Sequence, residues 1–569
     1  MATTTIGEFI IARLKAVGIT EILGVPGDFN LSFLEQIQEA DDFRFVGTCN
    51  ELNAAYAADG YARQHGVGAL LTTYGVGELS ALNGIAGSRA EHVPVISIAG
   101  APPQYATEYR WHLHHSLADG DFGNMLDAIR PFTEVATRVS PMNVVDEVDR
   151  AITTCIREKR PVHIQIPSDI THLEIDVPES EFSVALPHSD PERLETTVTR
   201  FLQLFDAARQ PVFLIDQDID RHGFTDLYRL IIDRAQIPYA HMASGKAILA
   251  ERDPLYLGIY NGAASSPGVQ AVVEGSDFCV TTNPRFIEGN SGSFTHNLPA
   301  DHIINIGDQH ISMGGEYFVG INSREALELI AAQIPRRLPA DTSPGTGIEI
   351  PDAQYEPDAT LTHARLWPQL GSFVREGDVV IAEAGTSNIG MGQIPMPAGV
   401  QYINSPIWGS IGFTLPALLG SQLAAPQRRH LLFIGDGSFQ LTAQELSTIL
   451  REQLNPIIFV LNNRGYTIER YILGMERDYN DVAAWRYTEL VNVFSPGSSM
   501  QTFQVHTEGE LDAALRAAER AAHGAFIELH LDPFDAPSGL QVFGPQTAAF
   551  DFGPRGPRNQ PQSAGGGSQ

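Results

Sequence analysis

The sequence predicts an α/β protein made of three doubly wound domains with mainly parallel sheets. Three segments each alternate short apolar runs with amphipathic stretches of helical period. Polar, proline-bearing stretches near residues 176–195 and 335–360 separate them. Strands that alternate with helices form parallel sheets covered by helices on both faces. The chain of 569 residues has room for three or four domains of about 150 residues each.

The first segment, residues 1–180, opens with a predicted amphipathic helix at 6–17, where Ile6, Ile10 and Leu14 recur at helical spacing. Its short apolar runs predict strands of the buried, parallel kind. These strands are expected at residues 21–25, 43–47, 69–73, 95–99 and 162–166.

The second segment, residues 195–340, begins with the apolar run 211–215 and closes with a predicted helix at 323–334. The third segment, residues 355–550, repeats the alternation. Its strands are predicted at residues 379–382, 431–434, 457–461 and 526–531. The tail, residues 551–569, has almost no apolar residues and is therefore predicted to be disordered.

Charge and hydropathy exclude two classes of function. The formal net charge of −31 argues against binding a nucleic-acid backbone, which requires clustered Lys and Arg. No apolar run approaches the ~20 residues that span a bilayer, so no membrane segment is expected. The N-terminus lacks a basic stretch followed by an apolar core, so we expect no secretory signal and a cytoplasmic protein.

Two polar motifs of the third segment each follow a predicted strand: GDGS at residues 435–438 and NNRG at residues 462–465. A strand that leads into glycines and a helix N-terminus suits a phosphate, because free backbone N–H groups and the helix dipole point there. Asp436 and Asn463 add hard oxygen ligands, which select Mg²⁺ or Ca²⁺. Either motif alone fits an ordinary turn equally well. Together they predict a diphosphate and metal site.

Four further motifs place titratable side chains at candidate strand ends or in loops. Glu51 lies in CNELNAAYAADGYAR directly after a predicted strand, and Asp28 lies in GVPGDFN after another. His114 and His115 lie in WHLHHSLADGDF, and Glu469 lies in GYTIE. Singly, these fit a first-turn Glu, a turn Asp, a surface His pair and a helical Glu. Brought together, such groups supply acids and bases near neutral pH.

The combination of VPGDFN, CNELNAAYAADGYAR, LHHSLADGDF, GDGSFQLTAQE and NNRGYTIER resembles the pyruvate, indolepyruvate and branched-chain 2-keto acid decarboxylases. The resemblance runs in the same order from residue 3 to about residue 540. It implies non-oxidative decarboxylation of a 2-keto acid to an aldehyde and CO₂, with thiamine diphosphate and Mg²⁺ as cofactors. LADGDF and LREQLNPI are most similar to the branched-chain and indolepyruvate branch.

The resemblance also implies roles. Residues 1–180 would be the pyrimidine-binding domain, 195–340 a central regulatory-type domain and 355–550 the diphosphate-binding domain. Glu51 would activate the cofactor. Substrate and protons would be handled by Asp28, His114, His115 and Glu469. The metal ligands would be Asp436, Asn463 and the Gly465 carbonyl. The cofactor contacts would come from Thr386, Ser387, Gly409, Ile411, Gly435, Gly437, Ser438 and Asn463.

The substrate pocket departs from the family pattern. Relatives usually carry an aromatic residue after the Thr-Ser pair, where this chain has Asn388 and Ile389, and Ala384 replaces a polar residue. Gly544-Pro545 should interrupt the C-terminal helix that covers the active site in relatives. We expect a pocket for branched-chain or aryl 2-keto acids, although Asn388 could instead bind a polar substrate group. Its lining would be Asn388, Ile389, Ile468, Ile472 and Phe543.

Three alternatives remain at this point. The chain could be a pyruvate decarboxylase proper. It could be a carboligase or oxidase that resembles acetohydroxyacid synthases or pyruvate oxidases, although those relatives lack the paired histidines and the GYTIE glutamate. It could also be a silent binding protein, against which the complete acid–base set argues. The resemblance further implies a homo-oligomer, usually a dimer of dimers, with Glu51 and Asp436 of two neighbouring subunits meeting at one cofactor.

Overall fold

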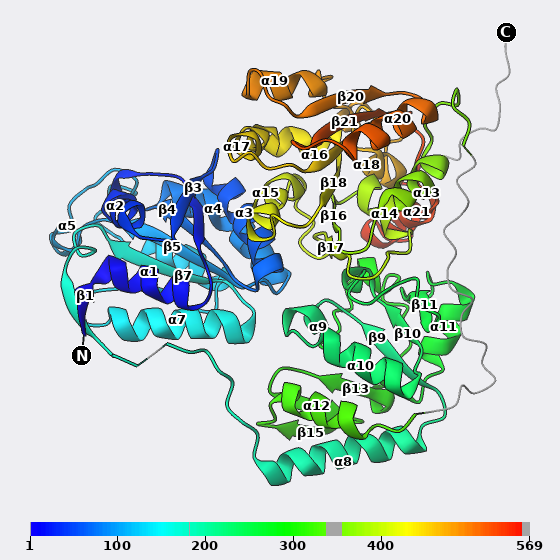
Figure 1. Cartoon of the computed structure of the whole chain (residues 1–569), viewed down its shortest axis with the longest axis horizontal. Coiled ribbons are helices and arrows are strands. Elements are labelled where there is room, and N and C mark those ends of the chain that lie inside the picture. Colours follow the sequence, from blue (N-terminus) through cyan, green and yellow to red (C-terminus); the bar gives the residue numbers. More distant parts are fainter. Residues whose placement is uncertain (1, 181, 337–354, 560–569) are drawn as a thin grey trace.

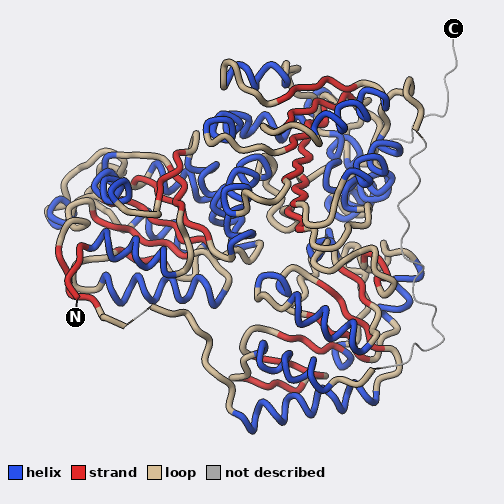
Figure 2. Tube along the Cα trace, in the orientation of Figure 1, coloured by secondary structure: helices blue, strands red, loops and turns tan. Residues whose placement is uncertain are grey.

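The computed structural model describes residues 2–180, 182–336 and 355–559 (Figure 1). Three sheets, each flanked by helices, build an N-terminal, a central and a C-terminal domain (Figures 1 and 2). The predicted α/β class with three mainly parallel sheets is confirmed. Within the described residues, no helix combines the length and apolar character needed to cross a membrane.

The N-terminal sheet has six parallel strands in the order β3-β2-β4-β5-β7-β6. The strands are β2 (Glu21–Gly24), β3 (Arg44–Gly47), β4 (Gly68–Thr73), β5 (Val95–Ala101), β6 (Ala136–Arg138) and β7 (Val162–Pro167). Each predicted strand is present. β6 is too short to stand out in the sequence. β1 (Ala2–Thr5) pairs antiparallel with β8 (Glu174–Val177), so the predicted linker starts within a strand.

Two helices of this domain, α1 and α3, begin at N-cap residues whose side chains accept a hydrogen bond. Thr5 and Glu8 form a capping box at the start of α1. The Asn50 side chain accepts a hydrogen bond from the Asn53 backbone N–H, and α3 therefore begins at Glu51. The helices are α1 (Ile6–Ala16), α2 (Leu31–Glu39), α3 (Glu51–His65), α4 (Val76–Ala90), α5 (Gln104–Glu108), α6 (Asn124–Ile129) and α7 (Val144–Glu158).

The central sheet has the order β11-β10-β9-β12-β13-β14-β15. Its last two strands run antiparallel, because tight turns after β13 and β14 reverse the chain. The strands are β9 (Pro211–Ile215), β10 (Tyr239–His241), β11 (Tyr256–Ile259), β12 (Phe278–Thr281), β13 (Ile303–Ile306), β14 (His310–Met313) and β15 (Glu316–Val319). The helices are α8 (Pro191–Ala207), α9 (Asp218–Arg221), α10 (Thr225–Ala235), α11 (Pro267–Glu274) and α12 (Ser323–Gln333).

The C-terminal sheet is parallel throughout, in the order β17-β16-β18-β19-β21-β20. Its strands are β16 (Val379–Ala382), β17 (Gln401–Ile403), β18 (His430–Gly435), β19 (Ile457–Asn462), β20 (Gln501–Val505) and β21 (Ala525–His530). The helices are α13 (His363–Phe373), α14 (Thr386–Gly392), α15 (Thr414–Ala424), α16 (Asp436–Thr442), α17 (Leu446–Arg451), α18 (Thr467–Ile472), α19 (Leu490–Phe494), α20 (Glu508–Ala518) and α21 (Ser538–Asp551).

The expected interruption at Gly544-Pro545 is wrong, because α21 runs through both residues. A proline inside a helix removes one hydrogen bond and costs about 3 kcal/mol, which packing against neighbouring helices offsets. A β-carbon on Gly544 would lie 2.6 Å from the Tyr471 carbonyl oxygen of α18. Gly544 therefore lets α21 pack closely against α18 and does not end α21.

Part of the predicted tail packs against the C-terminal domain. Asp551 ends α21, and Asn559 forms hydrogen bonds with the end of α18: its side-chain oxygen accepts from Gly474 N–H at 2.8 Å and its amide donates to the Arg470 carbonyl at 2.7 Å. Residues 560–569 lie outside the described chain, as does most of the second predicted linker.

The N-terminal and C-terminal domains share one core across α3 and α15. A β-carbon on Gly60 would lie 2.1 Å from the Ala417 carbonyl oxygen, and one on Gly420 would lie 1.7 Å from that of Ala57. The two helices therefore meet backbone to backbone, which small residues alone allow. This contact fixes the two domains to each other within the chain.

The central domain contacts the C-terminal domain through a buried ion pair, Lys246–Glu251. Lys246 also donates to the Ile394 carbonyl at 2.9 Å, and Glu251 accepts from Met396 N–H at 2.9 Å. Burial would raise the pKa of Glu251, but Lys246 and His241 lower that pKa to about 2. The pair therefore tethers the segment that directly follows α14.

Replacing Lys246 by Met should destabilise the protein by about 3–5 kcal/mol, because it leaves a buried carboxylate without its cation. The midpoint of chemical unfolding measures this loss. Arg150→Met, which breaks an exposed pair with Glu147, is the matched control and should cost under about 1 kcal/mol. Lys246→Met combined with Glu251→Gln, which removes the charge but keeps an acceptor for Met396 N–H, should regain most of the loss; a double variant as unstable as the single one would contradict the assignment.

Candidate active site

Glu51 is the first residue of α3 and follows β3 at the carboxyl edge of the N-terminal sheet. Its carboxylate lies beside the start of α4, where a β-carbon on Gly77 would lie 3.3 Å from Glu51 Oε1. Open α/β sheets bind ligands at this edge. The fold thus places Glu51 where a bound ligand can meet it.

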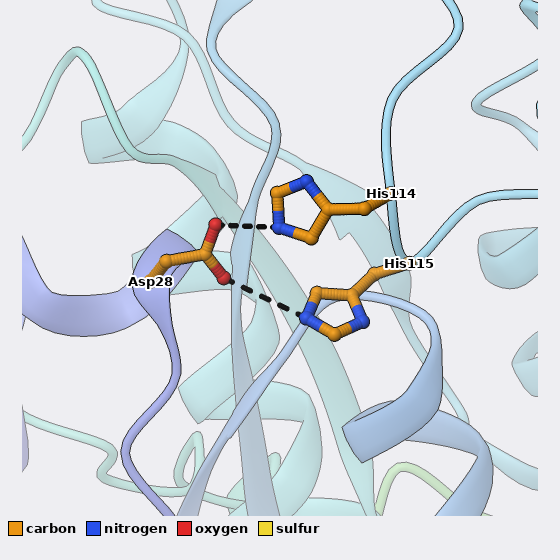
Figure 3. A group of neighbouring side chains, drawn as sticks. All are labelled: Asp28, His114 and His115. Atoms are coloured by element: carbon orange, nitrogen blue, oxygen red, sulfur yellow. Dashed lines mark hydrogen bonds and ion pairs between the residues drawn. The ribbon is translucent and has the colours of Figure 1, made fainter.

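Asp28, His114 and His115 converge at the same edge (Figure 3). Asp28 starts a 3₁₀ turn after β2, and both histidines come from the loop after α5. Asp28 Oδ2 lies 2.7 Å from His114 Nε2, and Asp28 Oδ1 lies 3.7 Å from His115 Nε2. Phe29 stacks on the His114 ring at 5.0 Å. The motifs grouped these residues by resemblance, and the structure brings them together in space.

A glycine turn connects this cluster to Glu51. Gly75 adopts a positive φ of 65°, and a β-carbon on it would lie 2.0 Å from the His115 carbonyl oxygen. Gly77, beside the Glu51 carboxylate, is two residues further on. The turn after β4 therefore supports both the histidine loop and Glu51.

The three predicted metal ligands lie close together in the C-terminal domain. Asp436 begins α16 after β18, and Asn463 and Gly465 follow β19. One end of the Asn463 amide lies 3.1 Å from Asp436 Oδ1 and 2.9 Å from the Gly465 carbonyl oxygen; turned one way it donates to both, and turned the other way it presents its oxygen to them. Acceptors that face one another with no hydrogen between them repel, and rotating the amide would relieve this. A cation among them makes the arrangement favourable, so the set fits a hard metal ion.

The Asp436 carboxyl supports the same interpretation. It is buried, and its Oδ2 has no hydrogen-bond partner among the described residues. Burial raises its pKa to about 7, although the backbone N–H groups of Gly437, Arg464 and Gly465 donate to it. A buried carboxylate of this kind requires a positive partner. The side chain is therefore arranged for a cation.

The remaining predicted cofactor residues surround this point. Thr386 and Ser387 begin α14, and the buried Ser387 Oγ has no partner among the described groups. Gly409, with a φ of 65°, and Gly435 both have open space where a β-carbon would stand. Gly437 packs under the Tyr466 ring, Ser438 is buried and Ile411 is half-buried. A cavity of about 350 Å³ reaches Asp436.

Glu383 is a site residue that the motif analysis missed. It follows β16 directly, is buried, and accepts hydrogen bonds from Thr414 Oγ1 at 2.6 Å and Gly412 N–H at 3.2 Å. Burial raises its pKa to about 7. Glu383 thereby joins the turn before α14 to the segment around Gly409. The sequence did offer one signal for Glu383, namely an acidic residue directly after a predicted apolar strand.

The predicted pocket residues lie on three neighbouring helices, α14, α18 and α21. A β-carbon on Gly385 would lie 3.8 Å from Ile468 Cγ2, and one on Gly539 would lie 3.1 Å from Ile389 Cγ2. Ile472 and Phe543 are half-buried on α18 and α21. The Asn388 oxygen accepts from Tyr402 at 2.9 Å and Asn404 at 3.2 Å. This oxygen is already satisfied, which argues against the alternative of a polar substrate contact.

Glu469 lies on α18, in the C-terminal domain, whereas Asp28, His114, His115 and Glu51 lie in the N-terminal domain. Partial burial, and secondarily the charge of Asp551, raise the pKa of Glu469. A raised pKa keeps the carboxyl protonated to higher pH, which suits a proton donor. The predicted catalytic residues thus form two groups on two domains.

Comparison with known proteins agrees with this division. Residues 4–125 match the thiamine pyrophosphate enzyme N-terminal TPP binding domain, residues 198–331 the central domain and residues 383–529 the C-terminal TPP binding domain of the same enzymes. A solved structure from Mycobacterium smegmatis, described as a thiamin diphosphate-dependent enzyme, aligns with a TM-score of 0.74 at 20% identity. The alignment covers 93% of this chain and 100% of the other. The fold and the site define a thiamine-diphosphate enzyme.

Two curated relatives narrow the class. The alpha-keto-acid decarboxylase of Mycobacterium avium is 40% identical over 91% of this chain and 92% of its own length. Pyruvate decarboxylase isozyme 3 of Saccharomyces cerevisiae is 37% identical, and the alignment covers 96% of this chain and 99% of the yeast protein. This chain belongs to the family of thiamine-diphosphate-dependent 2-keto acid decarboxylases.

Proposed function

We propose that the protein converts branched-chain or aryl 2-keto acids to aldehydes and CO₂ with Mg²⁺ beside its cofactor, in preference to pyruvate. The observation that carries the metal assignment is the convergence of oxygens from Asp436, Asn463 and Gly465. Mg²⁺ binds carboxylate, amide and carbonyl oxygens and takes its remaining ligands from phosphate and water. For the diphosphate, Ser387 Oγ supplies a hydrogen-bond donor, and the open space at Gly435 supplies room.

Thiamine diphosphate, when bound, supplies the carbon that adds to the keto group and the electron sink for the loss of CO₂. The chain contributes proton handling and orientation. Glu51 offers a carboxyl group for a hydrogen bond to the cofactor. Asp28, His114 and His115 exchange protons with the reacting groups, and Glu469 donates one.

The substrate preference follows from the side chains that stand where relatives carry an aromatic. Ile389 and Ile468 are aliphatic, and the Asn388 oxygen is occupied by Tyr402 and Asn404. An apolar pocket discriminates one methylene by only about 1–3 kcal/mol, so the preference should be graded. This supports larger acids over pyruvate without excluding it.

We expect kcat/KM for 2-ketoisovalerate, 2-ketoisocaproate and phenylpyruvate to exceed that for pyruvate, because Asn388 and Ile389 leave more room than an aromatic side chain. CO₂ and aldehyde release across the four acids is the measurement. Asn388→Phe should favour pyruvate, and Asn388→Asp, which adds no bulk, is the matched control. A clear preference of the native protein for pyruvate would instead identify a pyruvate decarboxylase proper.

A homo-oligomer, with a dimer of dimers as the expected form, would complete the site. The two groups of catalytic residues lie on different domains, and α3 and α15 hold those domains fixed. We propose that Glu51 of one subunit and Asp436 of its neighbour meet at one cofactor across a two-fold axis.

Mixing inactive Glu51→Gln chains with inactive Asp436→Ala chains should restore activity, because a mixed dimer holds one intact site. After full exchange, half the dimers are mixed and about a quarter of the wild-type activity should return. Native mass spectrometry of a mixture in which one variant is isotope-labelled provides the exchange control. No recovery despite proven exchange would show that each site lies within one subunit.

A further inference from the structure

The cluster of Asp28, His114 and His115 has the ligand set and the spacing of a transition-metal site. One ligand atom from each residue lies within 4.8 Å of the others (Figure 3). Two imidazole nitrogens and a carboxylate are a zinc ligand set. Around a tetrahedral Zn²⁺ with bonds of about 2.0–2.2 Å, ligand atoms stand about 3.3 Å apart. The 2.7 Å contact of His114 Nε2 and the 3.7 Å contact of His115 Nε2 run to different oxygens of Asp28, and the shorter one is a hydrogen bond that a bound ion would replace.

The two histidines are held in place before any ion binds. Phe29 stacks on His114 at an interplanar angle of 20° and meets His115 edge-on at 77°. His115 adopts a positive φ of 58°, and its carbonyl packs against Gly75. Little side-chain freedom is therefore left to lose on binding, which favours affinity.

Within a single chain, the cluster is also open to an ion from solvent. The side chains of His114 and Asp28 are 60% and 47% exposed. Three protein ligands leave a fourth position open, as in catalytic zinc sites. A 2-keto acid can occupy that position, since its carboxylate and keto oxygens can bind one ion together.

Ligand chemistry separates this cluster from the oxygen set on the C-terminal domain. Asp436, Asn463 and Gly465 offer oxygens alone, which suit Mg²⁺. Imidazole nitrogens favour Zn²⁺, Ni²⁺ or Co²⁺ instead. The two sets of side chains would therefore select different cations.

We propose that Asp28, His114 and His115 bind Zn²⁺ or a similar transition-metal ion, and that the bound ion inhibits decarboxylation by removing these side chains from proton exchange. The inhibitory part rests on the proposed function; the binding part does not. Binding of the ion makes and breaks no carbon bond. The ion takes the place of a proton on the imidazole nitrogen that it binds, because histidine binds a metal as the neutral imidazole.

Zn²⁺ binding is tested by calorimetry on the enzyme saturated with thiamine diphosphate and Mg²⁺, without substrate. We expect one Zn²⁺ per chain, and a Co²⁺-loaded sample with the absorption of a low-coordinate site. His115→Ala and Asp28→Asn should each weaken binding by more than about tenfold. Losing a group that only hydrogen-bonds to a ligand already costs about 10–100-fold, and a direct ligand matters more. His112→Ala removes an exposed histidine of the same loop and should bind as wild type.

Equal Zn²⁺ affinity in wild type, His115→Ala and Asp28→Asn would overturn the proposal, provided that the variants still bind cofactor and are therefore folded. Activity is the second arm. Zn²⁺ in the presence of excess Mg²⁺ should inhibit wild type and His112→Ala equally, and a zinc-selective chelator should restore both. Zn²⁺ that binds without slowing turnover would overturn the inhibitory role. A chain that binds Zn²⁺ through His115 but decarboxylates no 2-keto acid would refute the proposed function and leave the metal site standing.

Discussion

Glu51→Gln should lower turnover by about 10²–10⁴-fold, the contribution of a well-placed acid–base group. The variant keeps the size and the helix position of the side chain but cannot hold or release a proton. The exchange of the cofactor's thiazolium proton with deuterium, followed by NMR, should stop with it. Affinity for thiamine diphosphate should change by less than about tenfold, or 1.4 kcal/mol, because the diphosphate and metal ligands lie on the other domain.

Glu35→Gln is the matched control for this experiment. It changes an exposed glutamate on α2 of the same domain and should leave exchange and turnover as in wild type. Normal proton exchange in Glu51→Gln would remove the activating role from this residue. Loss of exchange together with loss of cofactor binding would point instead to a structural role at the start of α3.

Asp436→Ala should remove the cofactor from the purified protein, and prolonged dialysis of wild type against a chelator should do the same. A ligand that binds only the native state stabilises it, by about 2.7 kcal/mol at a hundredfold excess over Kd. The rise in Tm on adding thiamine diphosphate and Mg²⁺ should therefore vanish in the variant. Asp478→Ala, an exposed aspartate on the same domain, should retain the full rise.

The cofactor-free forms make this test specific. Asp436 has one oxygen unpartnered among the described residues but also accepts from three backbone N–H groups, so the Tm of the cofactor-free variant is the reference from which its rise is measured. Burial raises its pKa to about 7, and Mg²⁺ requires the deprotonated carboxylate. Affinity for Mg²⁺ should accordingly weaken as the pH falls below about 7 and level off above it. Unchanged cofactor content in Asp436→Ala would refute the assignment.

Much of the fold was predictable, because each sheet is made of short apolar strands bounded by turns. The strands 211–215 and 379–382 match β9 and β16, and the others differ by a residue or two at their ends. Among the described strands, β1, β6, β8, β10–β15, β17 and β20 were not predicted, since strands of three to five residues carry little periodic signal. β6 and β15 are also edge strands that are only partly buried, so their apolar pattern is weak.

The motifs predicted which residues would come together, but not what supports them. Glu383 and the ion pair Lys246–Glu251 form no motif, and their role becomes visible only through partners far along the chain. The predicted helix break at Gly544-Pro545 was wrong for a related reason. Local propensity predicts a break there, whereas tertiary contact with α18 sustains the helix.

The backbone contact between α3 and α15 has a consequence for how the chain is made. The two helices are separated by more than three hundred residues, including the whole central domain. At about 5–20 residues per second, a ribosome needs roughly 20 to 70 seconds to deliver α15 after α3 has emerged. During that interval the alanine- and glycine-rich face of α3 has no partner from its own chain. The sheet of the N-terminal domain can fold early. The core that this domain shares with the C-terminal domain can form only near the end of synthesis, when the central domain is already present.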